Sequence, residues 1–274
     1  MRRIVLLTAI VILGAACGPL KPPPSGPNVE ARFLSSCTFS HRLPDDPIVF
    51  PGNAGVSHSH DFLGNVSTNA TSDYSSLRGA SSTTCQPSDD KAAYWVPTVS
   101  VGGTPVPPVF ATFYYRGNKR DFQQVIPFPA GLKLIAGTAS ATTPQPQSIT
   151  TWGCTNGSTN TSEIPTCPAG ERLKLSLFFP DCWDGVNLDS ADHKSHLSYR
   201  TNGLCPNSHP FRVPQLQFFV VYATTGGPTT TLASGSQYSA HGDFFNAWDQ
   251  SVLNARVANC INAGIKCNKF GVPE

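Results

Sequence analysis

The chain has 274 residues, which suits one large domain or two small ones. Only 13% of its residues are charged, well below the ~25% usual for soluble proteins. The formal net charge is +2, with no basic excess of the kind that nucleic-acid binding requires. The 23 glycines and 25 prolines favour turns over long helices, and a hydrophobic share of 39% is enough for a sizeable core.

The N-terminus is expected to direct the chain out of the cytoplasm. Arg2 and Arg3 precede the apolar segment 4–13, which is too short to span a bilayer as a mature helix. Small residues then precede Cys17 in the sequence LGAAC, which is typical of a bacterial lipoprotein signal. We expect a signal peptide over residues 1–17, a lipid on Cys17 that ties the protein to a membrane, and a proline-rich linker over residues 18–30. An ordinary cleaved signal peptide is the alternative.

Cysteine usage agrees with an extracytoplasmic location. Of the nine cysteines, eight remain when Cys17 is set aside, and an even number in an exported chain indicates four disulfides. Pairing neighbours along the chain is the simplest arrangement, and it predicts the disulfides Cys37–Cys85, Cys154–Cys167, Cys182–Cys205 and Cys260–Cys267. Sequence does not determine connectivity, so other pairings stay open for all but the last. A cysteine-ligated metal is disfavoured, because the chain has no CxxC motif.

Alternating apolar residues predict strands along most of the remaining chain. In RLKLSLFF and PQLQFFVVY every second residue is apolar, which gives one apolar face to each segment: Leu173, Leu175, Leu177 and Phe179, then Leu216, Phe218, Val220 and Tyr222. VFATFYY and LKLIAG are shorter candidates. Near the C-terminus a helical face is expected instead, from the spacing of Phe245, Trp248, Val252 and Ala255.

These patterns predict a single domain over residues 31–274, and it is expected to be monomeric. Its fold class is mainly β: an antiparallel, jelly-roll-like β-sandwich with one C-terminal helix and long loops, stapled by disulfides. In such a fold the loops are the expected place for function.

Five of the seven histidines fall in three short motifs that also contain aspartates. The motifs are SHSHD with His58 and His60, DCWDGVNLDSADHKSH with Asp189, Asp192, His193 and His196, and YSAHGDFF with His241 and Asp243. Each has a plain structural interpretation as well: a polar turn, a charged loop, and a helix cap provided by Asp243.

The functional interpretation gathers these motifs into one cleft. Residues two apart share a face of an extended segment, so His58 and His60 are expected to project together. Asp189 and Asp192 would orient the histidines, because a carboxylate fixes the tautomer of an imidazole and raises its basicity. The catalytic candidates are therefore His58, His60, Asp189, Asp192, His193, His196 and His241. The candidate metal ligands are His58, His60, His193 and His196, and clustered imidazoles suit zinc or copper.

Aromatic side chains offer platforms for sugar rings, and Trp95, Trp183 and Tyr115 are the candidates for substrate binding. The alternative is that these rings belong to the core. The chain has no G-x-S-x-G motif, no P-loop and no dinucleotide-binding fingerprint.

The motifs resemble, in this order, a secreted domain-of-unknown-function family of fungi and actinobacteria. The residues that carry the resemblance are SHSHDFLGN, FFPDCWDGVNLDSADHKSH, CPNSHP and YSAHGDFFNAWD, and it extends from about Phe33 to Cys267. The resemblance implies an exported single domain with a connection to cell-surface polysaccharides, and it implies no particular reaction.

Two functions are therefore open. The first is an enzyme, a hydrolase or lyase, that acts on a cell-envelope or environmental polysaccharide through the histidines and aspartates, with a divalent metal such as zinc or copper as an open alternative for its cofactor. The second is a non-catalytic surface protein that binds a glycan or a divalent metal such as zinc or copper. Both the carboxylates of the first and the imidazoles of the second are present, so the sequence does not decide between them.

Overall fold

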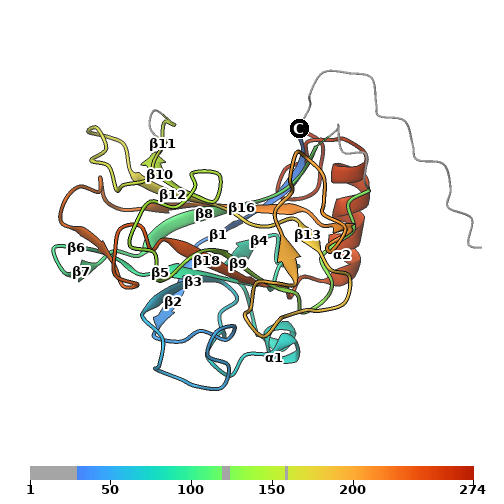
Figure 1. Ribbon diagram of the computed structural model, residues 1–274, viewed down its shortest axis with the longest axis horizontal. Coiled ribbons are helices and arrows are strands. Elements are labelled where there is room, and N and C mark those ends of the chain that lie inside the picture. Colours follow the sequence, from blue (N-terminus) through green and yellow to red (C-terminus); the bar gives the residue numbers. More distant parts are fainter. Residues whose placement is uncertain (1–29, 119–123, 158–159) are drawn as a thin grey trace, which may run out of the picture.

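Two antiparallel sheets form the framework of the structure, a computed structural model that describes residues 30–118, 124–157 and 160–274 (Figure 1). The expected signal peptide, the lipid site Cys17 and nearly all of the expected linker lie outside the described residues.

The larger sheet has seven strands and is the upper layer in Figure 1. In spatial order its strands are β11 (Asn160–Thr161), β10 (Thr150–Cys154), β12 (Leu173–Phe178), β16 (Gln215–Tyr222), β8 (Pro108–Asn118), β1 (Glu30–Cys37) and β4 (Cys85–Gln86).

The smaller sheet has five strands and is the lower layer in Figure 1. In spatial order its strands are β2 (Phe39–Leu43), β3 (His60–Gly64), β5 (Ala93–Pro97), β18 (His241–Phe245) and β9 (Lys133–Gly137). Two short three-stranded sheets complete the β-structure. One consists of β14 (Leu197–Ser198), β13 (Cys182–Trp183) and β15 (Phe211–Arg212), and the other of β17 (Thr230–Leu232), β6 (Val99–Val101) and β7 (Thr104–Pro105).

The two large sheets pack face to face over a single main core. The Tyr94 ring on β5 stacks on the Phe113 ring on β8, with centroids 3.8 Å apart. A Cβ atom added at Gly242 on β18 would lie only 2.4 Å from Leu177 Cδ1 on β12, so the sheets are in close contact. The alternating residues of RLKLSLFF and PQLQFFVVY are all buried in this interface. The prediction of a mainly β, antiparallel sandwich is confirmed.

The C-terminal helix is present, but it begins later than the sequence predicts. It begins as α2 (Gln250–Arg256), which continues as the π-helical segment η1 (Val257–Asn262). Phe245 lies in β18, because that segment pairs with both β5 and β9. The cap is Asp249, whose side chain accepts hydrogen bonds from the backbone of Ser251 and Val252.

A second, unexpected helix is α1 (Tyr74–Gly79) below the smaller sheet (Figure 1). Its N-cap is Asp73, whose side chain accepts from the Ser76 backbone while the Ser76 hydroxyl bonds back to the Asp73 backbone. None of the helices in the described ranges is long and apolar enough to cross a membrane.

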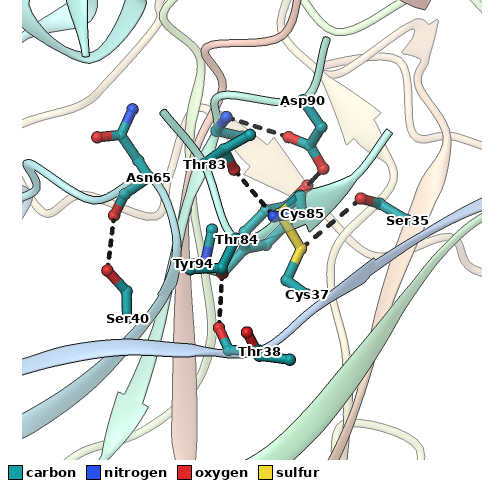
Figure 2. Close-up of a disulfide and its surroundings, with 12 residues drawn as sticks. Ser35, Cys37, Thr38, Ser40, Asn65, Thr83, Thr84, Cys85, Asp90 and Tyr94 are labelled. Carbon is teal, nitrogen blue, oxygen red and sulfur yellow. Dashed lines mark hydrogen bonds between the residues drawn. A yellow bond between two sulfur atoms is a disulfide. The ribbon is translucent and has the colours of Figure 1, made fainter. Parts of the chain in front are cut away.

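Four disulfides link the described chain, and they are the pairs Cys37–Cys85, Cys154–Cys167, Cys182–Cys205 and Cys260–Cys267 expected from the sequence. Figure 2 shows the first of them, which joins neighbouring strands β1 and β4 at the edge of the larger sheet. The buried carboxylate of Asp90 lies nearby and accepts a hydrogen bond of 2.7 Å from the Tyr94 hydroxyl. Four disulfides indicate an extracellular environment.

Candidate metal centre

The histidine motifs meet on the outer face of the smaller sheet. Leu63 and Phe244 point into the main core, whereas their neighbours Phe62 and Phe245 belong to a second, smaller cluster on the opposite face. Because side chains alternate along a strand, His60 shares this outer face with Phe62. The same alternation places His241 and Asp243 there with Phe245.

Strand β5 lies between the strands that provide these residues. His60 on β3 is paired with Pro97 of β5, and Asp243 on β18 is paired with Trp95 of β5. The long segment 44–59, which connects β2 to β3, supplies Asp45 and Asp46 near its start and His58 near its end. The site therefore combines one continuous stretch, the segment 44–59 with β3, and strand β18, which is distant from it in sequence.

Three imidazoles converge at this place. The Nε2 atom of His241 lies 3.2 Å from Nε2 of His58 and 3.3 Å from Nε2 of His60. One ligand atom from each residue lies within 4.8 Å of the other two, so the three residues could hold a metal ion. His60 and His241 are buried, with exposed fractions of 0% and 3%, and His58 is half-buried.

Backbone carbonyls determine which nitrogens carry protons. Nδ1 of His60 lies 2.9 Å from the Asp45 carbonyl oxygen, and Nδ1 of His241 lies 2.8 Å from the Ser239 carbonyl oxygen. A carbonyl oxygen only accepts, so both Nδ1 atoms must donate. In a neutral imidazole the other nitrogen then carries a lone pair. The Nε2 atoms of His60 and His241 are therefore two acceptors that face each other at 3.3 Å, a contact that a cation between them would make favourable.

The spacing of these atoms agrees with tetrahedral metal coordination. Zinc–nitrogen bonds of about 2.0–2.1 Å at tetrahedral angles place two ligand nitrogens about 3.3 Å apart. The observed Nε2 separations are 3.2 and 3.3 Å. The carbonyls that hold Nδ1 of His60 and His241 are also the outer partners that orient metal-bound histidines in proteins.

A buried carboxylate lies beside the imidazoles. Asp243 is 1% exposed, and its Oδ2 atom lies 3.9 Å from Nε2 of His241. That oxygen has no hydrogen-bond partner among the residues that the structure describes. Asp46, also buried, groups with His60 and Asp243 at metal-binding distances, although one of its oxygens already accepts from the backbone of Ile48 and Val49.

The electrostatics favour neutral imidazoles. Burial lowers the pKa of His58 and, with the neighbouring His241 and His58, lowers that of His60 well below its usual value. Burial also lowers the pKa of His241 to about 3. Neutral imidazole is the form that binds metals, so protons compete weakly for these nitrogens at neutral pH. The pKa of Asp243 is raised by burial and by the like charge of Asp46.

The segment 189–196 lies along strand β9 at the edge of the same sheet. The Lys194 ammonium donates to the Gly137 carbonyl at 2.6 Å, and Gly137 is paired with His241. Nδ1 of His193 lies 2.9 Å from Asp189, whose carboxylate also binds the Lys133 ammonium at 3.0 Å. This segment therefore borders the three-histidine cluster, and within it His193 is hydrogen-bonded to Asp189.

The second histidine of this segment has a structural role. His196 is 1% exposed, and its two nitrogens lie 2.9 Å from the Ser190 hydroxyl and 2.8 Å from the Lys133 carbonyl. With both nitrogens occupied, His196 offers no lone pair to a metal. Asp192 accepts from the backbone of Lys194 and Ser195, so it stabilises a turn. Those backbone hydrogen bonds, first that of Ser195, lower the pKa of its carboxyl.

Two of the three expected sugar platforms are core residues, so that expectation is wrong for Trp95 and Tyr115. Both are 0% exposed. Tyr115 stacks on Phe33 at 4.6 Å between the sheets, and Trp95 packs against Phe62 at 5.6 Å. A ring that reaches no solvent cannot stack on a ligand. Trp183 is half-buried, and its indole nitrogen donates to the Asn187 carbonyl at 2.6 Å.

Two residues of the site, Asp46 and Asp243, were not among the site residues expected from the sequence. A signal for Asp243 was present, because in HGD a strand would place it on the same face as His241. The segment was interpreted instead as the approach to a helix. Nothing in the sequence around Asp46 marks it, because its position depends on how segment 44–59 folds over the sheet.

Fold and site together define a disulfide-linked β-sandwich domain with a buried three-histidine cluster on the outside of one sheet. The sequence profile of a family described as "Domain of unknown function (DUF1996)" matches residues 46–248, and the chain belongs to this family. This confirms the resemblance noted from the motifs, and the matched range contains every residue of the cluster. No curated protein and no solved structure matches the chain in the corresponding comparisons.

Proposed function

We propose that this protein binds a divalent transition-metal ion, zinc or copper, outside the cytoplasm through His58, His60 and His241. The observation that supports this most strongly is the contact between two acceptor nitrogens, Nε2 of His60 and Nε2 of His241, at 3.3 Å. An ion between them would replace a repulsion between lone pairs with two coordinate bonds. Imidazole ligands suit zinc and copper better than they suit calcium or magnesium.

Asp243 is the fourth group in this proposal. Its unpartnered oxygen would gain a cation, and the ion would gain a negative charge in a buried place. In protein zinc sites three ligands and one open position favour catalysis through bound water, whereas four protein ligands favour stable binding. The position of Asp243 near His241 favours stable binding here.

The location follows from the proposed route of export. A lipid on Cys17 would hold the metal-binding domain at the outer side of a membrane, and the proline-rich segment after Cys17 would act as a spacer. A lipid-anchored metal site at the cell surface would capture ions before they reach the membrane.

The cleavage of a polysaccharide stays a prediction. With Trp95 and Tyr115 in the core, the aromatic support for it is reduced to Trp183, whose ring lies 6.1 Å from that of Phe211, a residue 45% exposed. The His193–Asp189 pair provides an oriented imidazole, which is the general acid or base that such a reaction needs.

Metal analysis of the mature protein, purified without a histidine tag, tests the proposal. We expect about one zinc or copper ion per chain after dialysis, and we expect titration with Zn²⁺ and Cu²⁺ to reload chelated protein. His60→Ala and His241→Ala should each remove this binding. His209→Ala is the matched control, because His209 lies outside the cluster and binds the Ser195 carbonyl. Binding that is absent in the wild type, or equal in all four proteins, contradicts the proposal.

A further inference from the structure

A second polar site lies on the outer face of the larger sheet, away from the histidine cluster. Tyr115, Leu216 and Phe218 point into the core, so their neighbours in β8 and β16 point outward. These neighbours help to line a pocket of roughly 350 Å³, at the lower end of the range for small-molecule sites. The side chains that line it are Glu30, Arg116, Arg200, Arg212, Gln215 and Gln217.

Positive charge dominates this pocket. Three guanidinium groups line it together with a single carboxylate, Glu30, which pairs with Arg116 at 2.7 Å. Behind the lining, the buried carboxylate of Asp181 pairs with Arg200 at 2.6 Å and lies 3.8 Å from Arg212. Each ion pair holds a guanidinium in place. Guanidinium groups bind planar or tetrahedral oxyanions with two parallel hydrogen bonds.

The pocket also offers a site for a hydroxyl group. Gln217 is 4% exposed, and its amide nitrogen donates to Gln215 at 3.1 Å. Its amide oxygen has no hydrogen-bond partner among the described residues, although it is buried. A buried acceptor without a partner is destabilising, and a donor such as a sugar hydroxyl would satisfy it.

Aromatic rings extend the site along the same face. The Arg116 guanidinium carbon lies 5.1 Å from the centre of the Tyr114 ring and 5.9 Å from that of Phe219. Both rings are half-buried, and they contact each other edge to face at 5.2 Å. They restrict the side chain of Arg116, which lines the pocket.

We propose that this pocket binds an acidic saccharide. The carboxylate or sulfate of the sugar lies against Arg116, with Arg200 and Arg212 beside it, and a ring hydroxyl donates to the Gln217 amide oxygen. This site is independent of the proposed metal centre, which lies on the outer face of the opposite sheet. It would hold the protein on an acidic glycan whether or not the domain carries an ion.

Affinity electrophoresis and calorimetry with defined polymers at physiological salt test this proposal. The probes are polygalacturonate for carboxylates, dextran sulfate for sulfates, and uncharged dextran. We expect one or both acidic polymers to bind and dextran to have no effect. A preference between the two identifies the oxyanion. Arg116→Gln should weaken binding at least about tenfold, the loss expected for one charge-assisted contact.

Two further variants make the test specific. Glu30→Gln should strengthen binding, because the Glu30 carboxylate competes with the ligand for Arg116. Arg78→Gln is the matched control, because Arg78 is also a partly exposed, ion-paired arginine, 3.5 Å from Asp249, and lies outside the pocket. His241→Ala should bind the glycan like the wild type. Thermal unfolding of each variant checks that it is folded.

Several results would overturn the proposal. An equal loss of affinity in Arg116→Gln and Arg78→Gln would mean that the polymers bind through the net charge of the protein and not through this pocket. Weaker binding by a folded Glu30→Gln variant would exclude competition at Arg116. Binding of none of the probes, or equal binding of dextran, would reject an acidic saccharide as the ligand.

Discussion

The Nε2 atoms of His60 and His241 lie 3.3 Å apart, although 181 positions separate the two residues in the chain. Their Nδ1 hydrogens are held by the backbone carbonyls of Asp45 and Ser239, so neither ring can rotate to turn its lone pair away without losing a buried hydrogen bond. The fold thus maintains an unfavourable contact that a cation would relieve.

Metal binding should stabilise the fold. An ion that binds only the folded chain raises the free energy of unfolding by about 2.7 kcal/mol at a free concentration 100 times its dissociation constant. Denaturant titrations of chelated protein, with and without Zn²⁺, measure this increase. The increase should be absent in His241→Ala and preserved in His209→Ala. An equal increase in His241→Ala would place the binding site elsewhere.

Asp243→Asn should change stability and metal affinity in opposite directions. Burial raises the pKa of the Asp243 carboxyl, so replacing it by an amide that cannot ionise should raise the free energy of unfolding of the metal-free protein at pH 8. The same change should lower the affinity for Zn²⁺ by about 10–100-fold, as loss of a group close to the ion does. Calorimetric titration and chemical unfolding give the two values. A purely structural Asp243 would alter stability and leave the affinity unchanged.

Asp90 should make stability depend on pH. Burial raises the pKa of this carboxyl to about 7, against the hydrogen bonds that it accepts from Ser35, Tyr94 and the Ala92 backbone. In the unfolded chain its pKa is about 3.9, so between these values the folded state binds more protons than the unfolded state. The contribution of Asp90 to stability is therefore fully present below about pH 4, and it is lost as the pH rises through about 7.

Asp90→Asn isolates this effect, because asparagine cannot ionise. The difference in free energy of unfolding between wild type and variant should fall with pH by up to about 1.4 kcal/mol per unit between roughly pH 4 and 7, and then level off. Denaturant unfolding at four pH values across this range measures it. A difference that is constant with pH would mean that the Asp90 carboxyl keeps an ordinary pKa in the folded protein.

Removing the Cys182–Cys205 disulfide should destabilise the protein and preserve metal binding. The disulfide closes a loop with a sequence separation of 23 that contains the segment 189–196, and no residue of the three-histidine cluster lies within it. Replacing both cysteines by serine should cost about 3 kcal/mol. The Cys260–Cys267 pair, with a separation of 7, is the control for which a smaller loss is expected. Loss of zinc binding in folded Cys182→Ser/Cys205→Ser protein would contradict the assigned ligands.

Local patterns in the sequence were reliable guides to the strands. The alternation in RLKLSLFF and PQLQFFVVY predicts their buried faces correctly, because a period of two belongs to the strand itself. The predicted start of the C-terminal helix was wrong, because long-range strand pairing and not local spacing determines the structure there. Phe245 fits a helical face by spacing, but its segment hydrogen-bonds to β5 and β9, which are distant in sequence.

Convergence of the histidines was predictable only in part. The pairing of His58 with His60 follows from local spacing, and their rings lie 4.2 Å apart. That His241 would join them was a hypothesis. The order of strands in the smaller sheet explains it, because only β5 separates β3 from β18. Whether Trp95 and Tyr115 are exposed depends on which sheet faces are covered, and this information is absent from local sequence.

Strand β5 lies between β3 and β18, the two strands that carry His60 and His241, and its pairing with both of them sets the register of these ligands. His60 is opposite Pro97 on β5, and the pairing of β18 with β5 sets the position of His241. A slip of one residue in either pairing would turn one imidazole toward the interior of the sandwich. An ion bound by both histidines would therefore favour the correct register of β3, β5 and β18. Metal binding would in this way stabilise the native pairing of the smaller sheet over shifted pairings.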